Sequence, residues 1–341
     1  MLLEDRRFTE LNKIGLVVNP AAGKDIRRLI AYGSVFGNQE KINYTLRLLR
    51  GIESVANSPV EVAYMPDPYD LLEIVKKSFS SPEIIFRCAP IPVFGDETDT
   101  LNFTDWAVNE KKVDALVVIG GDGTNRIVAK KSALTPLFSL FGGTNNVFAE
   151  NIEPTVMGMA VGLFLENGSL REKVVKKSKI LKAKPRGGGK EEIALIDAVV
   201  VEKTLVGARG VWEPELIRWI VVTQSSPVKI GLSSVVGRLA SISAEEERGA
   251  MVELGEGGKI IRAPLAPGLV GEVKIRKWEF LPLGASFLLP YQRGVMALDG
   301  EREIVLREGE DWEIRLEDTG PYRVDVEKLM NLVQERSVVN G

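Results

Sequence analysis

The sequence predicts a mainly parallel, doubly wound α/β domain followed by a β-sandwich-like domain. Between Ile14 and about Arg171, short apolar strands alternate with turn residues and amphipathic segments, which is typical of a doubly wound sheet. After about Lys173, β-prone runs follow one another with glycine and proline turns and little helical periodicity. A length of 341 residues also favours two domains over one.

The strands expected in the first domain are short and apolar, and each ends in turn residues. They cover residues 14–18, 60–64, 84–87, 115–119 and 137–141. In a doubly wound sheet the carboxyl ends of such strands form the ligand crevice, so the loops that follow them are the candidate site.

The second domain is predicted from β-prone runs, and a helix is predicted after it. The runs cover residues 194–201, 219–223, 272–275, 304–306 and 312–316. Over residues 324–335, Val326, Leu329, Met330 and Val333 share one helical face. We expect a nucleotide-binding domain over residues 1–172, a β-rich substrate and assembly domain over 173–323, and a tail over 324–341 that packs on the first domain.

Composition excludes several kinds of chemistry. The chain has no histidine, which removes Ser-His-Asp hydrolysis, histidine zinc sites and imidazole bases. Its single cysteine, Cys88, excludes an intrachain disulfide and is expected to be a small buried hydrophobe in a cytoplasmic protein. A net charge of −3 indicates no nucleic-acid partner. The longest nearly apolar stretch, residues 156–165, is too short to span a membrane.

A glycine-rich turn with one carboxylate follows the strand at residues 115–119. It reads Gly120-Gly121-Asp122-Gly123-Thr124, and such glycines let backbone N–H groups approach phosphate. Thr124 is placed to cap the next helix. An aspartate beside phosphate repels it unless it holds Mg²⁺ or accepts a proton from a hydroxyl. The alternative is that Asp122 makes only a local side-chain turn.

Two other loops follow strands of the first domain. The first is Asn19-Pro20-Ala21-Ala22-Gly23, after which Lys24, Arg27 and Arg28 could neutralise phosphates. The second is Gly142-Gly143-Thr144-Asn145-Asn146, whose hydroxyl and carboxamides could bind a base or a ribose. The alternatives are an ordinary turn before a helix and an asparagine-rich turn.

Far downstream, Asp299-Gly300-Glu301 lies between β-prone runs. An Asp-Gly pair in that setting is usually a hairpin turn. Its carboxylates bear on the site only if the second domain folds over the first.

These blocks, in this order, resemble the superfamily that joins NAD kinases with diacylglycerol and sphingosine kinases. Within it, the resemblance is closest to the ATP-NAD kinase-like family of acetoin-catabolism protein X. It rests on the three loops of the first domain, on Asp299-Gly300-Glu301, and on blocks at residues 155–158, 207–212 and 231–234.

The resemblance implies an ATP- and Mg²⁺-dependent phosphotransferase. Asp122 matches the aspartate that serves in Mg²⁺–ATP chemistry and in activating the acceptor hydroxyl, and Glu301 matches a glutamate that assists lipid kinases. The remaining binding positions implied by the motifs or by the resemblance are Asn19, Gly23, Lys24, Arg27, Arg28, Gly120, Gly121, Gly123, Thr124, Gly143, Thr144, Asn145, Asn146, Asp197 and Asp299. The resemblance also implies a homo-oligomer.

The motifs leave several candidates for the hydroxyl group that receives the phosphoryl group. The favoured acceptor is the adenosine ribose 2′-hydroxyl of NAD or NADH, which would make NADP or NADPH. However, Ile196-Asp197 stands where NAD kinases carry asparagine and an acidic residue, so Ile196→Asn is expected to improve NAD affinity if the dinucleotide binds in the family pose. Asp197 could instead be a solvent-facing strand residue. The alternatives are a kinase for a lipid or other small alcohol, and a catalytically silent nucleotide-binding regulator.

Overall fold

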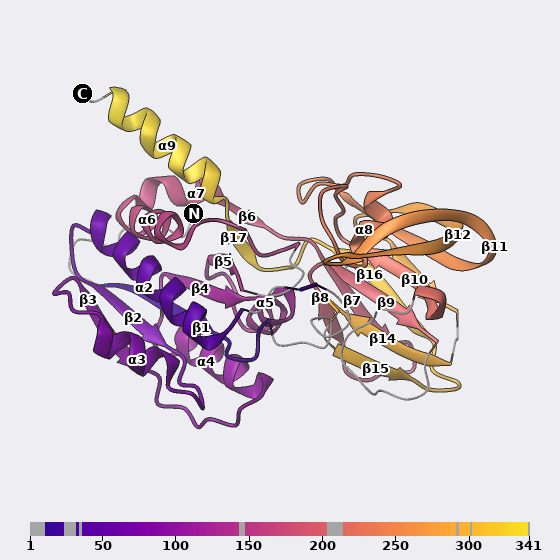
Figure 1. Cartoon of the computed structure of the whole chain (residues 1–341), viewed down its shortest axis with the longest axis horizontal. Helices are drawn as coiled ribbons and strands as arrows, with labels where there is room; N and C mark the ends of the chain where they lie inside the picture. Colours follow the sequence, from indigo (N-terminus) through magenta and orange to yellow (C-terminus); the bar gives the residue numbers. More distant parts are fainter. Residues whose placement is uncertain are drawn as a thin grey trace.

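The computed structural model describes residues 11–23, 32–33, 36–142, 147–202, 214–290, 293–300 and 302–339. The strands in this part of the chain form a seven-stranded, a six-stranded and a four-stranded sheet. The seven-stranded sheet and its helices form one end of the molecule, and the other two sheets form the opposite end (Figure 1).

The seven-stranded sheet has the order β3-β2-β1-β4-β5-β17-β6, and its first five strands are parallel. Its strands are β1 (Asn12–Val18), β2 (Val60–Tyr64), β3 (Ile84–Cys88), β4 (Ala115–Gly120), β5 (Leu137–Phe141), β6 (Val175–Lys177) and β17 (Tyr322–Val324). The strand order reverses at β1, which lies between β2 and β4. Ligands of doubly wound sheets bind at such a switch point, beyond the carboxyl ends of the strands.

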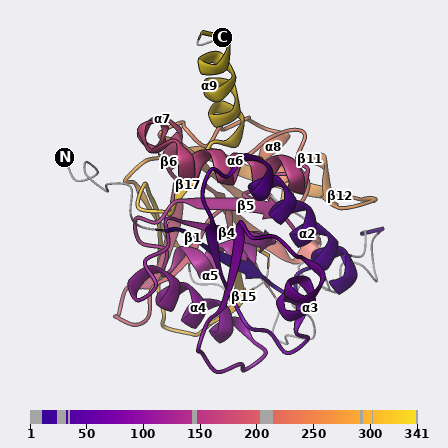
Figure 2. The same cartoon turned by 90° about the vertical axis from the view of Figure 1, so that its left-hand side faces the viewer.

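Helices cover both faces of this sheet (Figure 2). One face packs on α2 (Asn38–Val55), α3 (Leu71–Ser78), α6 (Pro154–Glu166) and the start of α9 (Val326–Val339); the other packs on α4 (Glu97–Asn109) and α5 (Asp122–Ala129). The short helices η1 (Gly168–Leu170) and α7 (Arg171–Val174) follow α6. Side chains alternate between the faces, as strand geometry requires: Val117 enters one core, and Leu116 and Val118 enter the other.

The antiparallel sheets begin after β6. The four-stranded sheet contains β7 (Ile180–Pro185), β8 (Glu192–Ala194), β13 (Ser286–Leu289) and β16 (Trp312–Glu317). The six-stranded sheet contains β9 (Asp197–Val201), β10 (Ile217–Val222), β11 (Arg248–Ala266), β12 (Leu269–Pro282), β14 (Gly294–Leu298) and β15 (Arg302–Leu306). The short helices η2 (Pro214–Leu216) and α8 (Ser233–Gly237) lie between strands of this sheet in sequence. One apolar cluster joins residues of both sheets, including Val200 and Ile314, so the sheets form a sandwich.

The chain returns to the parallel sheet near its carboxyl end. Strand β17 pairs with β5 in parallel and with β6 antiparallel, and Val326 and Leu329 at the start of α9 enter the core shared with α2 and α6. Met330, Leu332 and Val333 also pack against this core, and the C-terminal end of α9 projects from the body (Figure 2). The predicted fold class, a parallel α/β part followed by antiparallel sheets, is confirmed.

Candidate active site

The loop after β1 is tied to the glycine-rich turn after β4. The side-chain amide of Asn19 donates from Nδ2 to Oγ1 of Thr124 at 2.9 Å, and its Oδ1 accepts from the N–H of Ala21 at 2.8 Å. Gly23 adopts a φ of 71°, which favours glycine. Two motifs 105 residues apart in sequence therefore share a hydrogen bond at the carboxyl edge of the sheet.

A lysine that the sequence analysis did not single out holds the first of these loops. Lys41 on α2 is fully buried, and its Nζ donates to the carbonyl oxygens of Pro20 and Ala22, both at 2.8 Å. A buried ammonium needs such partners because desolvation penalises an unpaired charge. A lone lysine in an amphipathic helix carries no signal of this role, since most such lysines face solvent.

The glycine-rich turn is packed too closely for side chains. A Cβ on Gly120 would lie 2.8 Å from Cβ of Thr124, and one on Gly142 would lie 2.7 Å from the backbone nitrogen of Gly120. Helix α5 begins at Asp122 with Gly121 at its N-cap. The prediction that Thr124 caps this helix is therefore wrong: Thr124 lies in the first turn, and its hydroxyl oxygen accepts from Asn19.

Asp122 is buried and is held by the loop that follows β5. Its Oδ2 accepts the N–H of Val147 at 2.9 Å, and its Oδ1 accepts those of Phe148 at 3.0 Å and Ala149 at 3.3 Å. These partners are 25 to 27 residues away, so the alternative of a local side-chain turn is wrong. Burial raises the pKa of Asp122 to about 7, the three N–H groups oppose this shift, and the charge of Asp299 adds to it.

Asp299 repeats this arrangement in the antiparallel part. Its carboxylate accepts the N–H groups of Leu195 at 2.9 Å, Ile196 at 2.8 Å and Asp197 at 3.2 Å. Asp299 and Gly300 both have positive φ, at 51° and 69°, which matches the expected Asp-Gly hairpin turn between β14 and β15. Asp299 is therefore both a residue of the hairpin turn and a buried carboxylate that accepts three backbone N–H groups.

Arg126 joins these two regions and was not predicted. It lies one helical turn after Asp122 on α5, is 2% exposed, and donates from Nη1 to the carbonyl oxygen of Leu298. Burial raises the pKa of Asp299, and the positive charge of Arg126 is the first influence opposing that shift. Helix α5 lies where the two parts of the molecule meet (Figure 1), so this arginine connects them.

Ile196 and Asp197 are both buried. Asp197 is buried, so the alternative of a solvent-facing strand residue is wrong. Ile196 is 1% exposed and belongs to an apolar cluster that includes Val17 and Phe148. Ile196→Asn would place an amide among apolar side chains, so the expectation that it improves NAD affinity no longer holds.

Further contacts support the loop that binds Asp122. Arg323 on β17 pairs with Glu150 at 2.6 Å, and its guanidinium lies over the ring of Phe148 at 5.2 Å. Asn125 on α5 accepts from Ser139 on β5 at 2.7 Å and donates to the carbonyl of Gly121 at 2.9 Å. Strand β17 therefore contacts the loop whose N–H groups bind Asp122.

Several predicted positions lie outside the described residues. They are Lys24, Arg27, Arg28, Gly143, Thr144, Asn145, Asn146 and Glu301. Of the predicted positions that are described, Asn19 is hydrogen-bonded to Thr124, two residues after Asp122 in the same helix, and Asp299 accepts the N–H of Asp197 in the antiparallel part.

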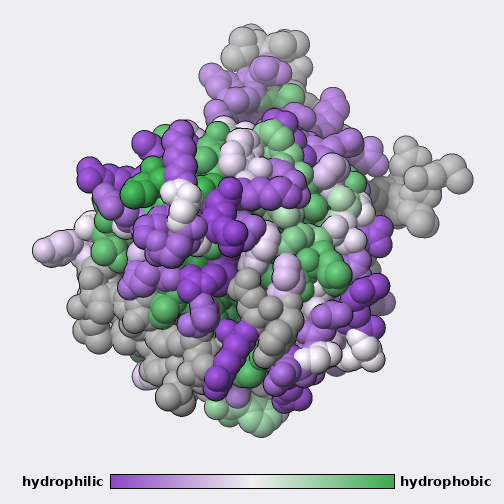
Figure 3. Space-filling view, turned by 90° about the vertical axis from the view of Figure 1, so that its right-hand side faces the viewer, coloured by the Kyte–Doolittle hydropathy of each residue, from purple (hydrophilic) through white to green (hydrophobic). Residues whose placement is uncertain are grey.

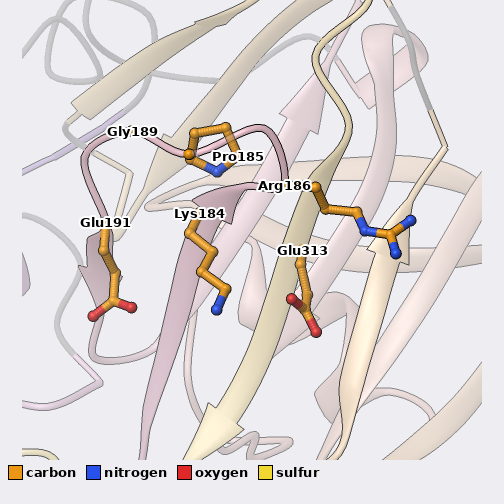
Figure 4. A pocket seen from close by; sticks show the side chains of 7 residues that line it. Lys184, Pro185, Arg186, Gly189, Glu191 and Glu313 are labelled. Atoms are coloured by element: carbon orange, nitrogen blue, oxygen red, sulfur yellow. The ribbon is translucent and has the colours of Figure 1, made fainter.

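A surface pocket lies on the antiparallel part of the molecule. It has a volume of about 360 Å³ and is lined by Lys184, Pro185, Arg186, Gly188, Gly189, Glu191 and Glu313. Its charged side chains extend from β7, β16 and the turn before β8 without converging on a common point (Figure 4). None of the predicted binding or catalytic residues lines it.

Cys88, the helices and the clustering of metal-ligating side chains complete the description of the candidate residues. Cys88 is exposed at the end of β3, so the prediction that it is buried is wrong. No helix in the described ranges is long and apolar enough to cross a membrane. Among the described residues, no group of three or more His, Cys, Asp or Glu side chains could hold a metal ion by itself.

Comparison with known proteins places the chain in a family. It is 32% identical over 331 residues to acetoin catabolism protein X of Cupriavidus necator, covering 93% of this chain and 91% of that protein. The chain belongs to the acetoin catabolism protein X family. The C-terminal domain of that family matches residues 179–319, which include all strands of the six-stranded and four-stranded sheets.

The fold is shared with a solved kinase. A crystal structure of yeast NADH kinase in complex with NADH superimposes with a TM-score of 0.50 at 14% sequence identity, covering 93% of this chain and 84% of that one. This chain of the acetoin catabolism protein X family therefore has an NAD kinase-like fold.

Proposed function

We propose that the chain transfers the γ-phosphoryl group of ATP to a hydroxyl group. The observation that carries this proposal is the position of Asp122: a buried carboxylate in a glycine-rich turn, at the start of a helix and at the carboxyl edge of a parallel sheet. The N–H groups near Gly120 and Gly123 and the positive end of α5 would favour phosphate there.

Asp122 has the chemistry of a general base. Its Oδ2 accepts one backbone N–H, which leaves this oxygen a further lone-pair direction for a hydroxyl proton. A pKa of about 7 lets the carboxylate gain and lose a proton near neutrality. In the proposed step, the acceptor oxygen bonds to the γ-phosphorus, the bond to the β–γ bridging oxygen breaks, ADP leaves, and Asp122 takes the hydroxyl proton.

The same carboxylate fits a magnesium site. Mg²⁺ is commonly held by one or two protein carboxylates together with substrate phosphates and water, so a site without a three-residue cluster can still bind it. Asp122 would hold the ion, which would neutralise phosphate charge. Glu301 remains the second candidate for proton transfer, and Lys24, Arg27 and Arg28 remain the candidate phosphate contacts.

The favoured acceptor is the 2′-hydroxyl of NAD or NADH. The likeness in fold to a structure that contains NADH supports this choice. A second support is the pair of buried carboxylates formed by Asp197 at the start of β9 and Asp299 directly after β14. The second candidate is a small alcohol. The apolar burial of Ile196 supports it, because this side chain offers no carboxamide to a dinucleotide. Acetoin itself carries a hydroxyl group and belongs in the test.

We also propose that the two parts are domains, over residues 1–172 and 173–323, with residues 324–341 packed on the first. Strand β6 still belongs to the parallel sheet, and β7 belongs to the four-stranded sheet, which supports a boundary in this region. Limited proteolysis tests this division: it should yield one resistant fragment that ends near residue 172 and another that begins near residue 173, and cleavage spread evenly over both parts would contradict it.

A phosphorylation screen tests the proposed activity. Mg²⁺–ATP is supplied with NAD, NADH, acetoin, diacylglycerol or a panel of sugars and polyols, and phosphorylated products are identified by mass. We expect NADP or NADPH. Efficient phosphorylation of another alcohol would contradict NAD(H) as the acceptor but would still support kinase activity. Thermal stabilisation by ATP without transfer to any alcohol would support a nucleotide-binding regulator instead.

A further inference from the structure

The loop after β5 that binds Asp122 is anchored to the sheet by Glu150. The N–H of Phe141 donates to the carbonyl of Glu150 at 2.8 Å, and the N–H of Glu150 donates to the carbonyl of Ser139 at 2.9 Å. Glu150 thus forms a single parallel bridge beside β5. The residues whose N–H groups bind the carboxylate of Asp122, residues 147–149, come directly before it. The position of Glu150 therefore determines where these N–H groups lie.

Arg323 on β17 binds this loop at two points. Its Nε and Nη2 both donate to Oε1 of Glu150, at 3.2 and 2.6 Å. Its guanidinium carbon also lies 5.2 Å from the ring centroid of Phe148. The side chains of Arg323 and Glu150 are 26% and 19% exposed, so salt and water screen this ion pair less than a fully exposed one. One side chain thus contacts both the anchor of the loop and a residue whose N–H binds Asp122.

Phe148 transmits this contact to Asp122. It is 2% exposed, its ring faces Arg323, and its N–H donates to Oδ1 of Asp122 at 3.0 Å. Its ring also belongs to the apolar cluster that contains Ile196. Interiors are close-packed and transmit strain, so a shift of this ring would move the N–H of the same residue. The contacts of Arg323 therefore bear on the hydrogen bonds of Asp122.

The backbone of β17 holds Arg323 in place. It pairs with Leu137 of β5 on one side and with Lys176 of β6 on the other, so Arg323 lies between two strands. Helix α9 begins three residues later, and its C-terminal end projects from the body with hydrophilic residues on the side seen in Figure 3. The support for Arg323 therefore comes from the sheet rather than from that end of α9. A planar guanidinium on a fixed backbone also loses little freedom when it forms hydrogen bonds.

We propose that Arg323 is a positioning residue for Asp122. Through Glu150 and Phe148 it keeps three N–H groups on the carboxylate, and this fixes the direction in which the remaining lone pair of Oδ2 meets the acceptor hydroxyl. The proposal rests on the proposed role of Asp122 as the proton acceptor. Arg323 acts through these two residues, so it should change how fast bound substrates react rather than how tightly they bind. A misplacement of about 1 Å in an active site can cost about 10²-fold in rate.

Hydrogen exchange by NMR and steady-state kinetics of Arg323→Met test the proposal. The amides of residues 147–149 should exchange about tenfold faster or more, whereas the amide of Val62 in β2 should keep its rate. With Mg²⁺–ATP and the acceptor found in the screen, kcat should fall about tenfold or more, and both KM values should stay within about threefold of the wild type. Arg323→Lys keeps a charge beside Glu150 without the planar guanidinium, so both of its effects should be smaller, about threefold.

Arg50→Met is the matched control. Arg50 on α2 also pairs with a glutamate, Glu53 at 2.7 Å, and its guanidinium lies over the ring of Phe79 at 4.4 Å. The variant loses the same two kinds of contact, but at helix α2 and the C-cap of α3. Exchange at residues 147–149 and kcat should therefore stay at their wild-type values.

The results separate the steps of this proposal. Unchanged exchange at residues 147–149 in Arg323→Met would show that Arg323 does not hold the loop. Faster exchange with a normal kcat would show that the loop does not position Asp122. Equal effects in Arg50→Met would indicate a general loss of stability instead of positioning.

Two further outcomes are also decisive. If Arg323→Met does not fold, Arg323→Lys carries the test, and wild-type exchange and kcat in that variant would overturn the proposal. A wild type that transfers no phosphoryl group would contradict the proposed function. In that case, hydrogen exchange would still decide whether Arg323 holds the three N–H groups on Asp122.

Discussion

Asp122 and Asp299 accept hydrogen bonds in the same way, but the charged side chains near the two carboxylates differ. In each, a buried carboxylate accepts three consecutive backbone N–H groups from a distant loop. Asp299 adjoins the buried cation Arg126, whose charge favours the ionised carboxylate. For Asp122, the carboxylate of Asp299 acts in the opposite direction and helps to raise the pKa to about 7. Asp299 fixes the segment before β9 and adjoins Arg126, which connects the two parts. We therefore propose that Asp122, rather than Asp299, is the carboxylate that exchanges a proton.

Removing the charge at Asp122 should have the largest effect on activity. Asp122→Asn should lower phosphoryl transfer by about 10²-fold or more, because a general base contributes about 10²–10⁴-fold. The measurement is kcat/KM with Mg²⁺–ATP and the acceptor found in the screen, corrected for the folded fraction. Asp311→Asn, at an exposed position between β15 and β16, is the matched control. Near-normal turnover of folded Asp122→Asn would remove Asp122 from the proposed role.

Removing Arg126 should have the largest effect on stability. Arg126→Met leaves the buried carboxylate of Asp299 without its neighbouring cation and should lower the free energy of unfolding by about 3–5 kcal/mol. Arg126→Lys keeps the charge and should recover part of this loss. Urea unfolding measures both variants, with Arg186→Met as an exposed control. Equal stability of Arg126→Met and the wild type would show that the arginine does not compensate Asp299.

Asp122 should also make stability depend on pH. Its folded pKa, about 7, lies above the ordinary value of 3.8, so the folded state keeps a proton that the unfolded state loses. The contribution is fully present below about pH 4 and is lost as the pH rises to about 7. Between these limits the wild type should lose stability relative to Asp122→Asn by up to about 1.4 kcal/mol per pH unit. Parallel pH curves for the two proteins in urea unfolding would contradict the raised pKa.

The link between the two glycine-containing loops should contribute least. Thr124→Val removes the hydroxyl that accepts from Asn19 and should cost about 0.5–1.5 kcal/mol of stability. A double-mutant cycle with Asn19→Ala isolates the pair. Additive single effects would mean that this hydrogen bond does not connect the loops energetically.

Much of the fold could be predicted from the sequence because the relevant signals are local. The five parallel strands of the first part are short apolar runs that end in glycine or proline turns, and all five were found within two residues of their observed ends. Strand β11 was missed because its middle, Gly255 to Lys259, contains three glycines that depress strand propensity. Its pairing with β12 overrides that local preference.

The candidate site was predictable only in part. Asp122 was found because a lone carboxylate among glycines is unusual. Lys41 and Arg126 were missed because their roles depend on carbonyl groups supplied by other elements: a loop about 20 residues away for Lys41, and a strand 172 residues away for Arg126. Thr124 was misassigned because the N-cap of the helix is Gly121, three residues earlier in the chain. The burial of Ile196 likewise follows from packing between the two parts.

The pH dependence of kcat/KM tests the difference between the two carboxylates most directly, because this ratio reports the free enzyme's essential groups. For the wild type, kcat/KM should rise with pH and level off near the pKa of Asp122, about 7. The residual activity of Asp122→Asn should lack this limb, whereas Asp299→Asn should keep it. A wild-type profile that is flat through neutral pH, or a limb that survives in Asp122→Asn, would contradict the assignment of Asp122 as the proton acceptor.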